Sequence, residues 1–402
     1  MNCGHRRGLW LYLGGPGALL MTHLPLSAVF DGLPDPRRDT RNKLHRLADI
    51  LAIATCAIIA GAESWEAIAE YGRTKADFFR GFLPLVNGIP SPETFERVFA
   101  KLDPAAFSRA FGRWMAAACE ATGLIPVAID GKSARRARRD TATGCLTVVS
   151  AWAVEDRLTL GQVAVADGSN EIGAIPELLG VLDLAGGIVT IDAAGCQVAN
   201  AEIIRRRGGH YLLAVKENQP KLLAAVESAF ERADAADFVG VVCDRHESKE
   251  DGHGRHEKRT VTVLYDPVGL PSAWPDVAAV VRIERVRSVG GKCSRTKHYY
   301  LSSHRGTAVE LGTRQRGHWG IENSLHWVLD VAFREDESRT RTGHAGANMA
   351  MIRRVAVTLL RRVEGKSSIQ TRRLTAAWDD ELMLKVVQAV PAVQRRKPVA
   401  CE

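Results

Sequence analysis

The spacing of apolar residues changes character near residue 124 of this 402-residue chain. Before that point apolar residues recur every three or four positions, as over residues 95–102, which predicts a series of short amphipathic helices. One helix has a clear start, because Ser91 is a favoured N-cap and Pro92 a favoured first residue. Short helices with tight turns and flanking basic residues are typical of a helix-turn-helix-like DNA-binding module. A plain helical bundle explains the same pattern.

After residue 124 the chain reads as strands alternating with helices. Two apolar runs, Ile125 to Asp130 and Ile188 to Asp192, are predicted to be buried strands, and each ends in an aspartate. Together with the neighbouring runs they give the order β-β-β-α-β-α-β, which predicts a mixed sheet covered by helices. Residues 238–303 alternate with a period of two and predict a β-rich insertion.

Residues 316–330 are predicted to form an amphipathic helix. Ile321 and Leu325 belong to one apolar stripe, and Glu322 falls at the edge of that stripe. His326 lies one turn later on the same side as Glu322. Such a helix packs its stripe onto a core while it holds a carboxylate at the rim of a cleft. An ordinary amphipathic helix with an incidental glutamate is the alternative.

Asp130, Asp192 and Glu322 are therefore candidates for one acidic cleft. An unpartnered aspartate is costly inside a sheet, so the carboxylates that end the two strands should emerge at its edge. Two carboxylates about 4 Å apart repel by roughly 4 kcal/mol at an effective dielectric of about 20. A divalent cation relieves this repulsion, and oxygen ligands favour Mg²⁺ or Mn²⁺ over zinc. Two such ions about 3.5–4 Å apart serve phosphodiester chemistry. Each aspartate alone could equally be a strand-end cap or turn former.

Composition is compatible with this interpretation. The formal charge is +8 and the pI about 9.1, which suits a polyanionic partner. The eight cysteines include no Cys-x-x-Cys pair, which predicts a reduced cytosolic protein without a disulfide framework. The longest apolar run, Ile50 to Ala60, is too short to span a membrane, so no membrane partner is expected. Zinc at Cys243, His246, His253 and His256 is disfavoured, because their spacing matches no standard finger.

Five motifs surround the three carboxylates and follow one another along the chain. They are Asp130-Gly-Lys, Thr190-Ile-Asp192-Ala-x-x-Cys-Gln197, Val215-Lys216-Glu-Asn218-Gln-Pro, Gly252-His-Gly-Arg255-x-Glu257-x-Arg259, and His318-Trp-x-Ile-Glu322-Asn-x-Leu-His-Trp-x-Leu-Asp330-Val-x-Phe-x-Glu-Asp. From residue 29 to residue 362 the chain thereby resembles the H-repeat-associated transposases of the ISAs insertion-sequence type. The motif set is highly specific as a whole, whereas Asp-Gly-Lys alone is weak.

The resemblance implies an α/β fold with a ribonuclease H-like mixed sheet core. It also implies an Asp-Asp-Glu triad, which maps to Asp130, Asp192 and Glu322. The implied activity is Mg²⁺-dependent cleavage at transposon ends and strand transfer into target DNA, with Mn²⁺ able to substitute. The implied partners are double-stranded terminal inverted repeats and target DNA, bound by a homodimer or larger assembly at the nucleoid in the bacterial cytoplasm. The alternatives are a ribonuclease H-like nuclease without strand transfer and a domesticated, non-catalytic DNA-binding protein.

Basic and polar residues near the motifs are candidates for binding DNA. Several cations directly follow the first aspartate, and each phosphate contact adds about 0.9 to the salt dependence of binding; a solvated hairpin tip is the alternative.

Related transposases often have Tyr and Arg before the catalytic glutamate and a basic residue two turns after it. This chain has Gln315, His318 and Leu329 at those places. Trp319 and Trp327 are candidates for stacking on a base, with core packing as the alternative. The predicted DNA contacts are Lys132, Arg135, Arg136, Lys216, Asn218, Arg316, His318, Asn323, His326, Arg339 and Arg341.

The predicted domain organisation follows from these changes of pattern. It consists of a disordered or mis-assigned start over residues 1–28 (with Met21 as another start), a helical DNA-binding domain over 29–123, the first part of the core over 124–218, the β-rich insertion over 219–304, the catalytic helix and the helix after it over 305–364, and a tail over 365–402.

Overall fold

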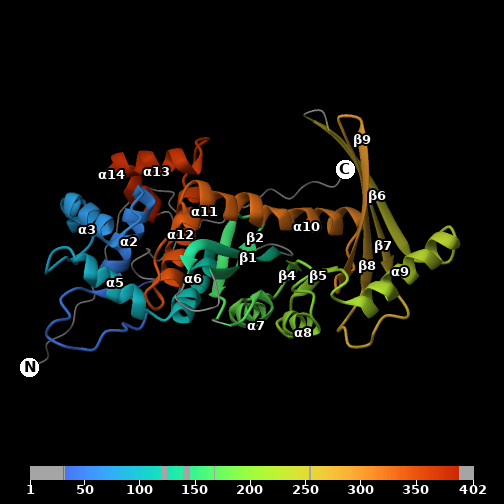
Figure 1. Ribbon diagram of the computed structural model, residues 1–402, viewed down its shortest axis with the longest axis horizontal. Coiled ribbons are helices and arrows are strands. Elements are labelled where there is room, and N and C mark those ends of the chain that lie inside the picture. Colours follow the sequence, from blue (N-terminus) through green and yellow to red (C-terminus); the bar gives the residue numbers. More distant parts are fainter. Residues whose placement is uncertain are drawn as a thin grey trace, which may run out of the picture.

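The structure is a computed structural model of the chain, in which helices surround one large sheet (Figure 1). Three predictions fall outside the described residues: the start over residues 1–28, the side chain of Arg135 and the zinc candidate His253. The described residues are residue 30 and residues 32–118, 125–138, 145–166, 168–252 and 255–388.

The first part of the described chain is helical, as predicted. α2 forms its centre and is buried along almost its whole length. α5 has Ser91 at its N-cap and Pro92 as its first residue, although the Ser91 side chain makes no capping bond to the backbone. The helices are α2 (Leu47–Ala60), α3 (Trp65–Thr74), α4 (Ala76–Arg80), α5 (Pro92–Lys101) and α6 (Pro104–Ala118).

A nine-stranded sheet runs through the rest of the molecule in the order β3-β2-β1-β4-β5-β9-β8-β7-β6. Parallel pairs join β1 to β4 and β4 to β5, whereas the other pairs are antiparallel, so the sheet is mixed as predicted. The strands are β1 (Ile125–Arg138), β2 (Cys145–Ala153), β3 (Leu158–Ala164), β4 (Gly187–Ile191), β5 (His210–Val215), β6 (Cys243–Gly252), β7 (Arg255–Tyr265), β8 (Ala279–Val289) and β9 (Lys292–Ser302).

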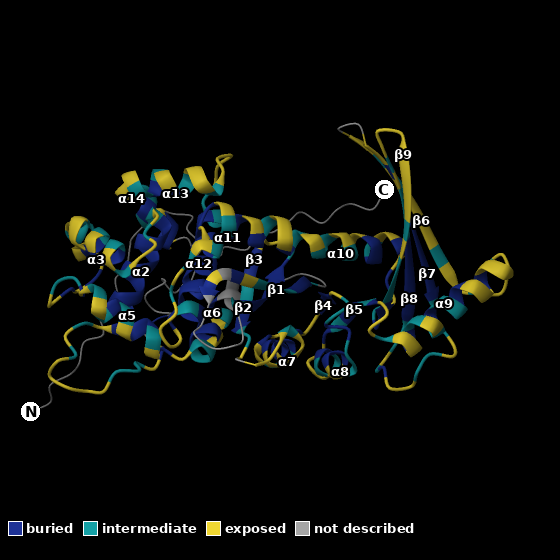
Figure 2. Cartoon of the chain, in the orientation of Figure 1, coloured by how far each residue is buried: buried dark blue, intermediate teal, exposed yellow. Residues whose placement is uncertain are grey.

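The β-rich insertion extends the core sheet and does not form a separate sheet. Its last strand, β9, pairs with β5, with Leu301 opposite Leu213. Burial decreases along the insertion (Figure 2): β8 is buried from Ala279 to Ile283 and becomes exposed towards Val289. The inner half of the insertion is therefore part of the core, and its outer half projects into solvent.

Helices cover both faces of the sheet. α7 (Glu171–Val181), α8 (Val198–Arg206) and α9 (Pro220–Ala235) pack on one face, where Ile129 belongs to their apolar cluster. Ala128 belongs to the apolar cluster on the opposite face, together with α12 (Ala345–Arg362). Because side chains alternate along a strand, Asp130 points to the same face as Ala128.

A helical rod crosses that second face from the insertion to the N-terminal helices (Figure 1). It begins as α10 (Ala308–Gly320), widens into the π-helical turn η1 (Ile321–His326) and continues as α11 (Trp327–Val331). The predicted helix over residues 316–330 is therefore present, with its apolar stripe buried and Glu322 exposed. The apolar spacing did not indicate the π-helical turn, a feature that is frequent at functional sites.

The C-terminal part packs against the N-terminal helices. After the short turn η2 (Glu335–Glu337) and α12, two further helices follow, α13 (Ile369–Trp378) and α14 (Asp380–Gln388). The interpretation of residues 365–402 as a tail did not include these helices; α13 packs against α2, and α14 packs against α12 and α13, where Met383 and Val386 are buried. Within the described residues no single helix is long and apolar enough to cross a membrane; α2 and α3 reach that length only together and bend by 97°.

Candidate active site

The parallel pair β1 and β4 brings Asp130 and Asp192 to neighbouring positions. The last residue pair of this ladder, Ile129 and Ile191, immediately precedes the two aspartates, so they lie at adjacent places. β4 ends before Asp192 as predicted, whereas β1 does not end at Asp130 but continues to Arg138, with Asp130 opposite Ser150 of β2. Backbone amides hold one oxygen of each. The N–H of Gly131 donates to Asp130 Oδ1 at 2.9 Å, and the N–H of Gly195 donates to Asp192 Oδ1 at 3.2 Å.

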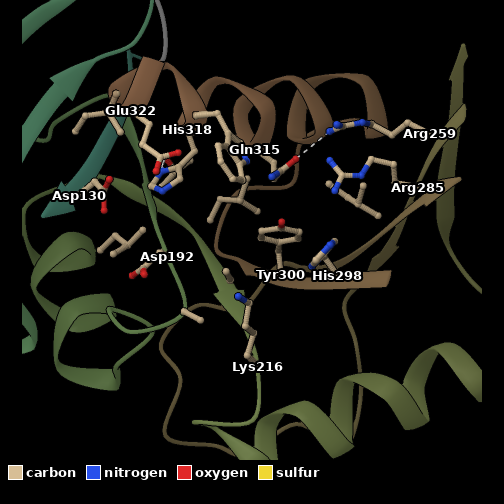
Figure 3. A pocket seen from close by; sticks show the side chains of 18 residues that line it. Asp130, Asp192, Lys216, Arg259, Arg285, His298, Tyr300, Gln315, His318 and Glu322 are labelled. Carbon is tan, nitrogen blue, oxygen red and sulfur yellow. Dashed lines mark hydrogen bonds between the residues drawn. The ribbon is translucent and has the colours of Figure 1, made fainter. Parts of the chain in front are cut away.

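Glu322 reaches the same site from the rod. Asp130, Asp192 and Glu322 line one pocket of about 340 Å³, and Figure 3 shows all three on the same side of it. Trp319 lines this pocket too and is 56% exposed, while Trp327 is 60% exposed. Three acidic side chains from distant parts of the sequence therefore share one pocket with Trp319, whereas Trp327 is exposed outside the pocket lining.

Asp130 is difficult to ionise in these surroundings. Burial raises the pKa of Asp130 most, and the charges of Asp192, Glu171 and Glu322 raise it further, to about 7; the hydrogen bond from Gly131 opposes this. A carboxyl with this pKa is about half protonated at neutral pH. A bound cation would favour the ionised form of Asp130.

Glu171 is a fourth carboxylate at this site, and the sequence analysis missed it. It is the first residue of α7 and lies against Gly131, where an added Cβ would come within 2.1 Å of Glu171 Oε1. Burial and then the charge of Asp192 raise the pKa of Glu171. Asn170 caps the helix, so Glu171 resembled an ordinary first-turn acid. The available signal was Gly131, because a side chain at this position would displace the Glu171 carboxylate from where it lies.

Two histidines of the rod contact β4 and β1. His318 Nδ1 lies 3.0 Å from the hydroxyl of Thr190 on β4. His326 Nδ1 lies 3.6 Å from Asp130 Oδ2, and the His326 residue is 8% exposed. Burial, followed by nearby positive charges, lowers the pKa of His326 to about 3, so its imidazole is neutral at physiological pH. Both histidines were predicted to contact DNA, and both are engaged with the protein in this structure.

The opposite wall of the pocket is basic. Lys216 follows β5, while Arg259, Arg285 and His298 come from β7, β8 and β9. Figure 3 shows these side chains across the pocket from the carboxylates, with Gln315 of α10 accepting a hydrogen bond from Arg259 at 3.2 Å. Burial, followed by the three neighbouring cations, lowers the pKa of His298. Of this wall, only Lys216 was among the predicted DNA contacts, because strand register decides which basic residues of the insertion face the pocket.

Three ion pairs of the buried cations Lys132 and Arg354 connect the elements near Asp130. Lys132 Nζ lies 2.7 Å from Asp330 and 3.3 Å from Asp336, and its side chain is 8% exposed. Arg354 of α12 is fully buried and pairs with Glu335 at 2.9 Å. These contacts join β1 and α12 to the end of the rod. Lys132, a predicted DNA contact, thus has two carboxylate partners within the protein.

The remaining predicted DNA contacts lie on the surface outside the pocket lining. Arg316 pairs with Glu250 of β6, and the Asn218 side chain donates to the carbonyl of Ala193 at 2.6 Å. The exposed residues of this group are Arg136, Asn218, Arg316, Asn323, Arg339 and Arg341.

The chemistry of the acidic residues fits a hard divalent cation. Carboxylate oxygens are the ligands that Mg²⁺ prefers. In the described part of the chain, no three His, Cys, Asp or Glu side chains are already close enough together to hold an ion. Convergence of the three carboxylates on one ion would have to come from side-chain rotation. The same finding applies to the zinc candidates Cys243, His246 and His256, of which His256 pairs with Asp251 at 2.5 Å.

Comparison with known proteins identifies the family. The "DDE_Tnp_1-associated" model matches residues 27–115, and the "Transposase DDE domain" model matches residues 122–359. The "H repeat-associated putative transposase YhhI" of Escherichia coli K12 is 34% identical over 377 residues, or 92% of this chain and 97% of the relative. The "Uncharacterized protein in dhlA 3'region" of Xanthobacter autotrophicus is 42% identical over 298 residues, or 72% and 97% of the two chains. These matches confirm the resemblance, and because the transposase model spans more than half of the sequence, the chain belongs to the transposase DDE domain family.

Proposed function

We propose that this transposase cleaves the ends of an insertion sequence and joins them to target DNA in the pocket of Asp130, Asp192 and Glu322. One observation carries the proposal: three separate elements each contribute one acidic side chain to a single pocket, opposite a basic wall. The strand order β3-β2-β1-β4-β5 supports a ribonuclease H-like core, with both aspartates directly beyond the last residue pair of the parallel β1–β4 ladder.

The proposed roles follow from where each side chain is attached. Asp130 lies within β1, Asp192 directly follows β4, and backbone amides orient both carboxylates, so they form the rigid half of the site. Glu322 is exposed on the π-helical turn and completes the triad from the other side. Mg²⁺ held by the three carboxylates, or Mn²⁺ in its place, supplies charge stabilisation and activation of the attacking hydroxyl. Cleavage and joining are both direct displacements at phosphorus and need no covalent protein intermediate.

DNA would occupy the basic half of the pocket. Arg259, Arg285, His298 and Lys216 lie across from the carboxylates, where they would bind phosphates next to the scissile one. The overall charge of +8 favours a polyanion. The proposed substrates are double-stranded terminal repeats and target DNA at the bacterial nucleoid, bound by a homodimer or larger assembly.

Glu322→Gln tests this function, with Glu202→Gln on the exposed surface of α8 as the matched control. The assay incubates protein, Mg²⁺, a DNA fragment with the element's own ends and supercoiled target plasmid. Wild type and Glu202→Gln should cut and join, whereas Glu322→Gln should bind the ends with unchanged affinity and do neither. Wild-type cleavage without joining would support a nuclease. Specific binding without cleavage by the wild type would support a domesticated DNA-binding protein.

A further inference from the structure

His326 is held against Asp130 on the protein side of the pocket. Its Nδ1 lies 3.6 Å from Asp130 Oδ2, and the N–H of Gly131 holds the other oxygen of the same carboxylate. His326 ends the π-helical turn that carries Glu322. At 8% exposure the imidazole has too little accessible surface to bind a phosphate of DNA. The buried contact therefore favours a role towards Asp130.

The geometry of the contact determines which nitrogen of a neutral His326 ring carries the proton. A neutral imidazole carries one proton, on either Nδ1 or Nε2. Because Nδ1 faces Asp130 Oδ2, a proton on Nδ1 attracts the ionised carboxylate, the form that a bound cation favours, whereas a lone pair there would repel it. Nε2 is then the unprotonated nitrogen; it is buried and, among the described residues, has no hydrogen-bond partner. The Nδ1–H tautomer is therefore favoured.

We propose that His326 is a positioning residue that donates its Nδ1–H to Asp130 Oδ2 and thereby orients this carboxylate in the active pocket. The inference rests on the proposed function. The present 3.6 Å separation is slightly longer than a hydrogen bond, and such contacts often tighten when a site is loaded. With Gly131 on one oxygen and His326 on the other, the plane of the carboxylate is fixed. Partners that orient a metal ligand in this way typically change affinity about 10- to 100-fold when removed.

Three substitutions of His326 separate orientation from simple packing. His326→Asn keeps an N–H donor near the place of Nδ1, His326→Gln puts its amide near the place of Nε2, and His326→Leu keeps only apolar volume. Mn²⁺ binding is measured by electron paramagnetic resonance on the purified full chain, alongside DNA-end affinity in EDTA and thermal unfolding. We expect Kd for Mn²⁺ to rise about 10- to 100-fold for the Leu and Gln variants and less than about threefold for Asn. DNA affinity should stay unchanged in all three.

The outcomes distinguish the positioning role from the proposed function. Equal Mn²⁺ affinity in wild type and His326→Leu would overturn the role of His326 and leave the proposed function intact. Equal losses for Asn, Gln and Leu would indicate packing and also overturn it. Loss of DNA affinity with Mn²⁺ affinity preserved would return His326 to the DNA contacts. A wild type that neither binds Mn²⁺ nor cleaves DNA would refute the proposed function itself.

Discussion

Replacing Asp130 by asparagine should remove one of the three carboxylates that we propose hold the metal ion and, at the same time, stabilise the fold. Asp130 has a pKa of about 7, compared with an ordinary value of 3.8, because it is buried among other carboxylates. In the folded protein it keeps its proton between about pH 4 and pH 7, where the unfolded chain has already lost it. Stability therefore falls as pH rises through this window, and the whole penalty is present above about pH 7. Asparagine is neutral and avoids the penalty.

The size of the effect follows from the difference in pKa. About 3 units at about 1.36 kcal/mol each give a penalty of about 4 kcal/mol in the wild type at pH 8. An unfolding entropy of about 2.1 cal/mol/K per residue, summed over this chain, is roughly 0.84 kcal/mol/K. Asp130→Asn should therefore raise the unfolding temperature by about 5 °C at pH 8 and by almost nothing at pH 4.

Thermal unfolding followed by tryptophan fluorescence between pH 4 and pH 8.5 measures this difference. The solutions contain EDTA, and exposed Asp156→Asn is the control, for which the profile should follow the wild type. Adding Mg²⁺ should stabilise the wild type more than Asp130→Asn, since the ion binds the ionised site. A difference between Asp130→Asn and the wild type that stays constant across the pH range would refute the reasoning, because it would arise from packing and not from ionisation.

Three further outcomes are expected. Glu171→Gln removes one of the charges that raise the pKa of Asp130, so this variant should lose less stability than the wild type as the pH rises from about 4 to above 7. Glu177→Gln, on the exposed side of α7, should follow the wild type in the same unfolding series. Arg354→Leu should destabilise the fold by roughly 3–5 kcal/mol because Glu335 is left buried and unpaired, and the double variant with Glu335→Leu should recover most of this in urea unfolding. Arg285→Ala should reduce the slope of log K for DNA against log salt by about 0.9, whereas Lys297→Ala, paired with Glu284 on the other face of the insertion, should leave it unchanged.

The sequence was sufficient to predict the elements that carry the acidic side chains. Asp130 and Asp192 belonged to recognisable apolar runs that form β1 and β4, although β1 continues past Asp130 to Arg138, and the apolar stripe around Ile321 predicted the rod that carries Glu322. These features are local, because a run of apolar residues and its period are visible within about ten positions. The motifs then identified the family, and the family models confirmed it.

What the sequence did not reveal depends on pairing between distant segments. Arg259 and Arg285 face the pocket together because β7 and β8 pair in one register, and a shift by one residue would turn both away. Glu171 is near Asp130 because of how α7 packs, and the spacing of residues along the chain does not reveal that contact. His326 and Lys132 were predicted to contact DNA because their burial could not be predicted from nearby residues. Both are buried behind the rod, and this depends on α12, which lies far along the chain.

The position of the rod also has a consequence for protein synthesis. Both aspartates and the whole basic wall precede residue 303, whereas Glu322 comes later and its helix packs against α12, which ends at Arg362. A chain that has been translated only as far as residue 303 therefore still lacks the third acidic side chain of the site. On the proposed function, such a partial chain would not cut DNA.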